Sequence, residues 1–281
     1  MATAIAKLGY IADAFFPADN LPLFRAKVVS CLDSQLPVII VMQQGSTGHA
    51  ICLTGFSEPR DLVKVSLHSG VAISMRGASA DVNYVHDDNL GSHAHYEFYD
   101  VLIGNLLQKV LGLATPRQML RRGRSNEPPV PWWNVDDWQV LAALVPKPEE
   151  LRLSIDSLFT IVVEFRTVNQ LALPNVDVNY ALRFSSGAKY KESIIDWGFG
   201  PTELRAFYAR ASLPRHVGVI STYQERRHLF DTLVDASEVE RIQQQPTILG
   251  LVAPGVPEQS FAGAAFRAIG NVITAPVLLA P

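Results

Sequence analysis

The strongest structural signal in the chain is residues 36–56, LPVIIVMQQGSTGHAICLTGF. Residues 38–42 form an uninterrupted apolar run of strand length, and residues 50–56 form a second one. A Gly/Ser/Thr-rich stretch separates the two runs, and such residues mark turns. The sequence therefore predicts two adjacent, mostly buried strands.

Amphipathic spacing precedes this pair of strands. Apolar side chains recur at steps of three and four through residues 21–36, at Leu21, Phe24, Val28, Cys31 and Leu32. That spacing predicts a helix with one buried face, which Pro37 ends.

Further apolar runs follow the two strands. They predict strands at 71–75, 82–86 and 94–98, and then a helical stretch near 101–113. The N-terminal part thus reads as a helix that leads into a small, largely antiparallel sheet.

A change of composition divides the chain. Residues 115–138 combine a run of arginines with a proline group and three tryptophans, so we predict a linker there. The predicted domains are therefore 1–114 and 139–281. In the second domain we expect strands at 157–165, 178–184, 216–222 and 248–253, and a helix at 201–211. The fold class is α+β, with a second α+β unit after the first.

Composition limits the classes of function. The 281 residues are 48% hydrophobic, enough for a substantial core, and 24 basic against 27 acidic side chains give a formal charge of -3. A protein that coats nucleic acid or anionic membrane is not expected from this balance. Cys31 and Cys52 are the two cysteines, and the N-terminus lacks the pattern of a secretory signal, so we expect a reducing, cytoplasmic location.

Three local patterns occur in order: SCLDSQLPVIIVM at 30–42, GHAICLTGF at 48–56 and YVHDDNLG at 84–91. Together they resemble papain-like cysteine peptidases of the bacterial, bacteriocin-leader-processing type. The resemblance covers roughly residues 20 to 100 and implies a papain-like fold, an antiparallel sheet with flanking helices. It also implies that His49 is the general base and that Asp87 orients it, with Asp88 as the neighbouring alternative. An imidazole can accept a thiol proton when a carboxylate fixes its tautomer.

The family's nucleophilic cysteine lies at the start of a helix many tens of residues before the histidine, and only 48 residues precede His49. The spacing of Cys31 directs it into the core, and Cys52 is three positions from His49 in the same strand, hence on the opposite face. We expect neither to be the nucleophile. Either the chain is the C-terminal portion of a longer protein, or the fold has been kept for binding after losing catalysis. A plain Met1 ahead of what reads as the middle of a domain favours truncation or a misassigned start.

A metal site is the rival interpretation of the same region. Five of the seven histidines fall between 49 and 95, and the run His86-Asp87-Asp88 precedes His93 and His95. Imidazole and carboxylate groups suit zinc, iron or manganese.

The sequence therefore predicts a papain-like cysteine peptidase or related amide hydrolase, truncated or inactive, that acts on a peptide or protein. A non-catalytic peptide- or protein-binding protein is the alternative, and a His/Asp metal-binding protein is the third. No cofactor is expected. We assign no chemistry to Asp231 and Asp235, which flank a short apolar segment, and we interpret the arginine run as solvated linker.

Overall fold

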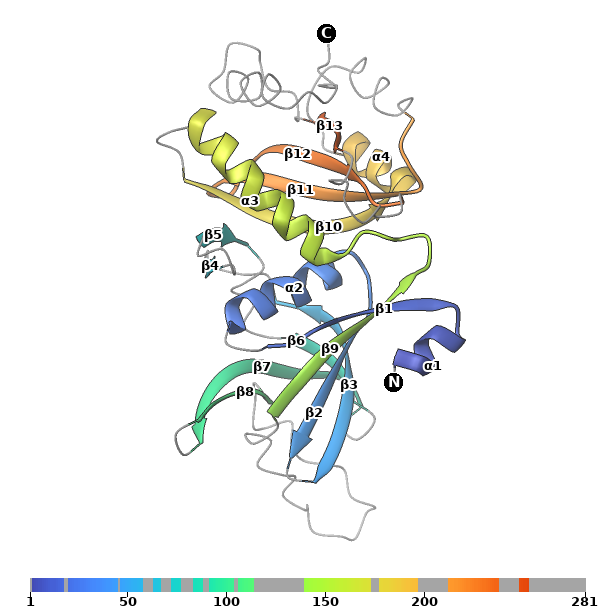
Figure 1. Ribbon diagram of the computed structural model, residues 1–281, viewed down its shortest axis with the longest axis vertical. Coiled ribbons are helices and arrows are strands. Elements are labelled where there is room, and N and C mark those ends of the chain that lie inside the picture. Colours follow the sequence, from blue (N-terminus) through green and yellow to red (C-terminus); the bar gives the residue numbers. More distant parts are fainter. Residues whose placement is uncertain are drawn as a thin grey trace. The chain divides into compact units, whose positions relative to one another are not determined.

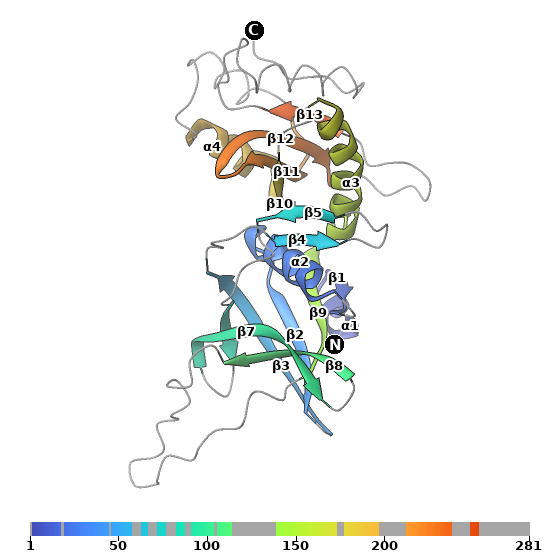
Figure 2. The ribbon, with the colours of Figure 1, turned by 90° about the vertical axis from the view of Figure 1, so that its left-hand side faces the viewer.

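A computed structural model describes residues 2–17, 20–44, 46–57, 63–66, 72–76, 83–87, 91–103, 106–113, 139–172, 177–196, 212–237 and 248–252. The protein is α+β, with four helices and two sheets in these ranges (Figures 1 and 2). It divides into two compact units. Unit 1 comprises Met1–Leu67 and Arg76–Pro148, and unit 2 comprises His68–Met75 and Glu149–Pro281.

Unit 1 is built on an antiparallel sheet of seven strands. They are β1 (Tyr10–Phe15), β2 (Val38–Gln44), β3 (Thr47–Phe56), β6 (Asn83–Asp87), β7 (Gly91–Ile103), β8 (Leu106–Leu113) and β9 (Gln139–Pro148), in the order β1-β9-β2-β3-β6-β7-β8. One further pairing, Val110 with Gln139, joins β8 back to β9. Six strands therefore form a closed ring, with β1 attached outside it along β9.

Buried apolar side chains occupy alternate positions of paired strands in the ring. Ile40 of β2 pairs with Ile51 of β3, and both side chains are buried. Leu53 pairs with Val85 of β6, and these two side chains are fully buried as well. One face of β2, β3 and β6 is thus continuous core, which fixes the register, because a slip by one residue would turn the apolar side chains outward.

Two helices and one short strand are also described in unit 1. They are α1 (Ala2–Lys7), α2 (Leu21–Asp33) and β4 (Val63–Ser66). The Asn20 side chain caps α2 by accepting a hydrogen bond from the Leu23 N–H at 2.9 Å, and a proline follows in the first turn. Phe24 packs edge-to-face on Phe15 of β1 at 6.1 Å between ring centroids, so α2 contributes to the same core.

The described residues of unit 2 form a mixed sheet and two helices. Its strands run β13 (Ile248–Val252), β12 (Arg227–Asp235), β11 (His216–Gln224), β10 (Val178–Ser186) and β5 (Ala72–Met75), with β5 parallel to β10 and the other pairs antiparallel. The helices are α3 (Ile155–Ala172) and α4 (Gly187–Asp196).

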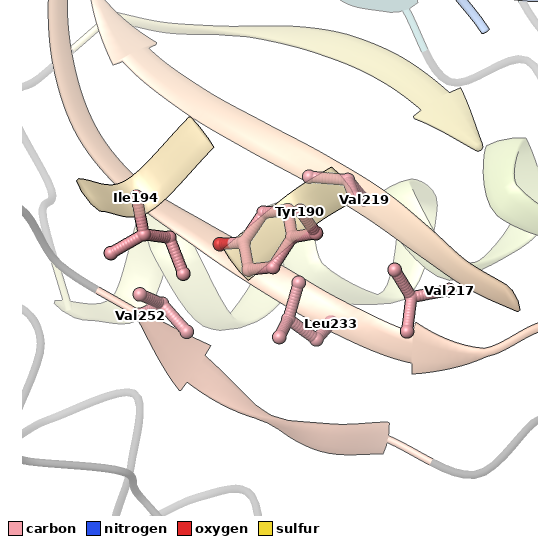
Figure 3. Close-up of a cluster of buried hydrophobic side chains, with 6 residues drawn as sticks. All are labelled: Tyr190, Ile194, Val217, Val219, Leu233 and Val252. Carbon is pink, nitrogen blue, oxygen red and sulfur yellow. The ribbon is translucent and has the colours of Figure 1, made fainter. Parts of the chain in front are cut away.

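The helices of unit 2 lie on the two sides of this sheet (Figure 2). Gly218 faces Leu158 of α3, while its neighbours Val217 and Val219 belong to a buried cluster with Tyr190 of α4. Figure 3 shows this cluster, which also contains Ile194, Leu233 and Val252. Both faces of the sheet are therefore covered where the helices pass.

Several predicted elements are confirmed. They are the helix at 21–36 and the strands at 38–42, 50–56, 71–75, 82–86, 94–98, 178–184, 216–222 and 248–253, within one or two residues at most ends. Residues 94–98 lie inside the longer β7. The predicted linker 115–138 and helix 201–211 lie outside the described residues.

Two predicted elements are wrong. Residues 101–103 and 106–113 lie in the antiparallel strands β7 and β8 in place of a helix, and the two strands pair from Tyr96 with Leu113 to Ile103 with Leu106. Residues 157–165 lie in α3 in place of a strand. The buried positions Ile155, Leu158, Phe159 and Val162 have helical spacing, and this outweighs the β-branched residues.

Two further observations concern the whole chain. Residues 139–148, expected to open the second domain, form β9 of unit 1, because they pair with β1 and β2. Among the described helices, none has the length and apolar character needed to cross a membrane.

Candidate functional site

His49 and Asp87 occupy neighbouring strands of unit 1. His49 is the third residue of β3, and Asp87 is the last residue of β6. The two strands are antiparallel, so the start of one lies beside the end of the other. The positions that the peptidase resemblance singles out therefore meet at one end of the ring.

The strand register defines this relation more closely. The last paired residues of β3 and β6 at this end are Cys52 and His86. Asp87 follows His86, and His49 precedes Cys52 by three residues, so both positions lie beyond this pair at the same end of the two strands. The side chain of Asp87 and all of Asp88 lie outside the described residues.

His49 itself is half-buried and continues the core face of β3. Its pairing partner on β2 is Met42, which is buried. Position 49 thus lies at the end of the apolar core face of β3. The strand fixes the backbone of this histidine, and its side chain is partly exposed.

Neither cysteine shares that position. Cys31 is 2% exposed on α2, within the core. Cys52 lies on the opposite face of β3 from His49, and partial burial raises the pKa of its thiol. Since the thiolate is the nucleophile, a raised pKa and the wrong face both count against Cys52 as the reacting group.

The metal interpretation gains no support from the described side chains. His86 is exposed on β6, and its pairing with Cys52 puts it on the face opposite Ile51 and His49. His93 and His95 are in β7, with side chains outside the described set. No group of three or more His, Cys, Asp or Glu ligands occurs among the described residues.

A second constellation, in unit 2, was not predicted. The Asp231 carboxylate of β12 is fully buried. His228 Nε2 lies 2.7 Å from its Oδ1, and the Tyr190 hydroxyl of α4 donates to its Oδ2 at 2.9 Å. The Arg183 guanidinium of β10 is 3.9 Å from Oδ2, and Ser221 lies directly across from Asp231 on β11. Four elements therefore direct polar side chains at one buried carboxylate.

A β-bulge brings His228 and Asp231 together. Residues three apart in a regular strand point to opposite faces. In β12, however, Thr222 pairs with Phe230 and Tyr223 pairs with His228, so Leu229 is an extra residue. The bulge reverses the alternation and turns His228 onto the Asp231 face, where its ring also packs on Tyr223 at 4.9 Å between centroids.

The electrostatics of the cluster favour an ionised carboxylate. Burial alone would raise the pKa of Asp231, but the hydrogen bond and charge of His228, the charge of Arg183 and the Ser221 hydroxyl outweigh it and hold the pKa below its usual range. The carboxylate is thus the fixed anion to which the surrounding donors are anchored.

Comparison with known proteins gives no further assignment: no family model, no curated protein and no solved structure matches this chain.

Proposed function

We propose that unit 1 carries the histidine and aspartate half of a papain-like cysteine peptidase or related amide hydrolase. The observation behind this proposal is that His49 and Asp87 lie at the same end of the antiparallel pair β3 and β6. A general base needs a rigid partner that fixes its tautomer, and two adjacent strands with a core-locked register supply such rigidity.

The roles follow from this placement. With both cysteines excluded, the attacking group in this chain would be a water molecule, whose oxygen bonds to the amide carbon as the C–N bond breaks. His49 would accept the water proton and pass it to the departing amine, and Asp87 would hold the imidazole and stabilise its charged form. Peptides or proteins are the proposed substrates. The nucleophile is assigned to neither Cys31, which is buried, nor Cys52, which is on the other face. No cofactor takes part in this proposal.

The positions of the two cysteines also favour a second candidate function. A papain-like domain without a thiolate beside its base would bind a peptide or protein and leave it uncleaved. The two candidates share the fold and differ in chemistry, so they can be separated by one assay.

The assay is incubation of the full chain with a peptide library, followed by mass spectrometry for both cleavage and retention. The hydrolase proposal expects cleavage that His49→Gln abolishes and that Cys31→Ser leaves unchanged, because Cys31 lies in the core. Retention of peptides without cleavage supports the binding function. Cleavage that survives His49→Gln would contradict the assignment of His49, and cleavage lost in Cys52→Ser would contradict the exclusion of Cys52.

A further inference from the structure

The cluster around Asp231 has an imbalance of charge. One buried carboxylate faces two basic side chains, Arg183 and His228. When the imidazole is protonated, the three groups together carry one excess positive charge. The neighbouring part of the same sheet face is apolar, formed by Tyr190, Val219 and the rest of the cluster in Figure 3. Positive charge beside an apolar surface is poorly solvated and favours a bound anion.

Arg183 is the group best placed to receive such an anion. Its position on β10 is separated from Asp231 on β12 by the whole of β11, so its side chain reaches across that strand. The only ion pair of Arg183 within the described residues, to Asp231 Oδ2, spans 3.9 Å, longer than a hydrogen bond. A guanidinium carries five N–H donors in a rigid fork, and this pair leaves donors directed elsewhere. The side chain is 25% exposed, so a ligand can approach it.

His228 is the second basic side chain beside Asp231. Its side chain is 22% exposed, and its ring is fixed on one side by Asp231 Oδ1 and across its face by Tyr223. The His228 ring is therefore anchored by Oδ1 of the buried carboxylate, while Arg183 lies 3.9 Å from Oδ2, so both basic side chains lie beside the same carboxylate. Preorganised donors of this kind bind anions at reduced cost in side-chain entropy.

We propose that unit 2 contains a binding site for a small anionic group, a phosphate or a carboxylate, held by Arg183 beside the His228 ring, with Asp231 as the residue that positions this ring. Arginine binds either group through two parallel N–H···O bonds. A metal cation is disfavoured at the same place because His228 and the Tyr190 hydroxyl already occupy the two carboxylate oxygens and the Arg183 charge lies close by. This site is independent of the function proposed for unit 1.

The test is titration of the full chain with inorganic phosphate and, separately, with acetate at constant ionic strength and about pH 6, where histidine side chains are commonly in part protonated. The His228 ring signals, identified by their absence in His228→Gln, are followed by NMR. Arg183→Gln removes the fork. Arg215→Gln is the matched control, since Arg215 is an exposed arginine of the same unit that pairs with Glu150.

Saturable shifts with either anion, unchanged in Arg215→Gln and weakened about tenfold or more in Arg183→Gln, would support the site, because a hydrogen bond to a charged group contributes about 1.5–3 kcal/mol. The anion that binds more tightly identifies the group recognised. If Arg183→Gln does not fold, Arg183→Lys keeps the charge without the fork and should also weaken binding. Absence of saturation with both anions, or equal affinity in the wild type and the Arg183 variant, would overturn the proposal.

Discussion

Each unit has a histidine and an aspartate on paired antiparallel strands, but in different arrangements. In unit 1, His49 and Asp87 lie at the same end of the neighbouring strands β3 and β6, and the histidine is half-buried. In unit 2, His228 and Asp231 are on one strand, joined through a bulge, and the aspartate is fully buried among donors from three other elements. The His49–Asp87 pair thus lies at the end of two strands, whereas the His228–Asp231 pair includes a carboxylate in the core of unit 2. Substitutions should therefore separate effects on chemistry from effects on stability.

The largest expected effect is that of Asp231→Asn. This change leaves His228, Arg183 and Tyr190 directed at a neutral amide inside the core, and breaking a buried charged pair costs about 3–5 kcal/mol. Urea unfolding of the full chain measures the free energy of unfolding of unit 2. Glu192→Gln, on the exposed side of α4, is the control and should change it by less than about 0.5 kcal/mol. A loss below 1 kcal/mol for Asp231→Asn would remove the contrast between the units.

A smaller effect is expected from Gly187→Ala at the start of α4, the helix that carries Tyr190. A Cβ there would meet the Pro214 carbonyl oxygen, which belongs to the backbone and cannot rotate away. Such overpacking costs about 1–3 kcal/mol. Gly48→Ala, beside His49 in unit 1, would meet only the Met42 carbonyl at 3.9 Å and serves as the matched control. Equal thermal stabilities of the two variants would contradict this account.

A fall in pH should lower the free energy of unfolding of unit 2 by less than these substitutions do. Burial, followed by the charge of Arg215, lowers the pKa of His216, although Glu150 opposes this. A histidine with a lowered folded pKa binds fewer protons in the folded state, so its contribution is present above its ordinary pKa and is lost as the pH falls below it. Stability should thus decline from about pH 7 to about pH 5. His216→Gln should flatten that decline, and an unchanged slope would refute the assignment. Asp231, with its lowered pKa, should add a further loss only below about pH 4.

The smallest effect on stability is expected from His49→Gln. The side chain is half-buried at a strand end, so the free energy of unfolding should change by less than about 0.5 kcal/mol. Circular dichroism during thermal unfolding measures this. A loss comparable to that of Asp231→Asn would mean that His49 is a core residue, and the comparison between the units would fail.

Strands of both units could be predicted from the sequence for a physical reason. In unit 1, the runs 38–42, 50–56 and 82–86 are strands because each has apolar side chains on the face that the ring buries. In contrast, Thr160 to Val163 is β-branched but helical, since tertiary packing of the buried face of α3 outweighs propensity.

The Asp231 cluster could not be predicted because it depends on a bulge. Three-residue spacing in a strand indicates opposite faces, and nothing in residues 227–235 signals that Leu229 is an extra residue. The donors from Tyr190 and Arg183 come from elements that only the folded sheet brings near. Sequence patterns therefore do not reveal a site whose residues are brought together by a β-bulge.

The central claim is that Asp87 orients His49, and the most direct measurement is the tautomer of the His49 ring, read from the nitrogen chemical shifts of its imidazole by NMR. The proposal predicts one dominant tautomer in the wild type, a mixture in Asp87→Asn, and the wild-type result in Asp88→Asn, the matched neighbouring variant. A tautomer ratio that Asp87→Asn leaves unchanged would contradict the claim and leave His49 as a polar residue at a strand end.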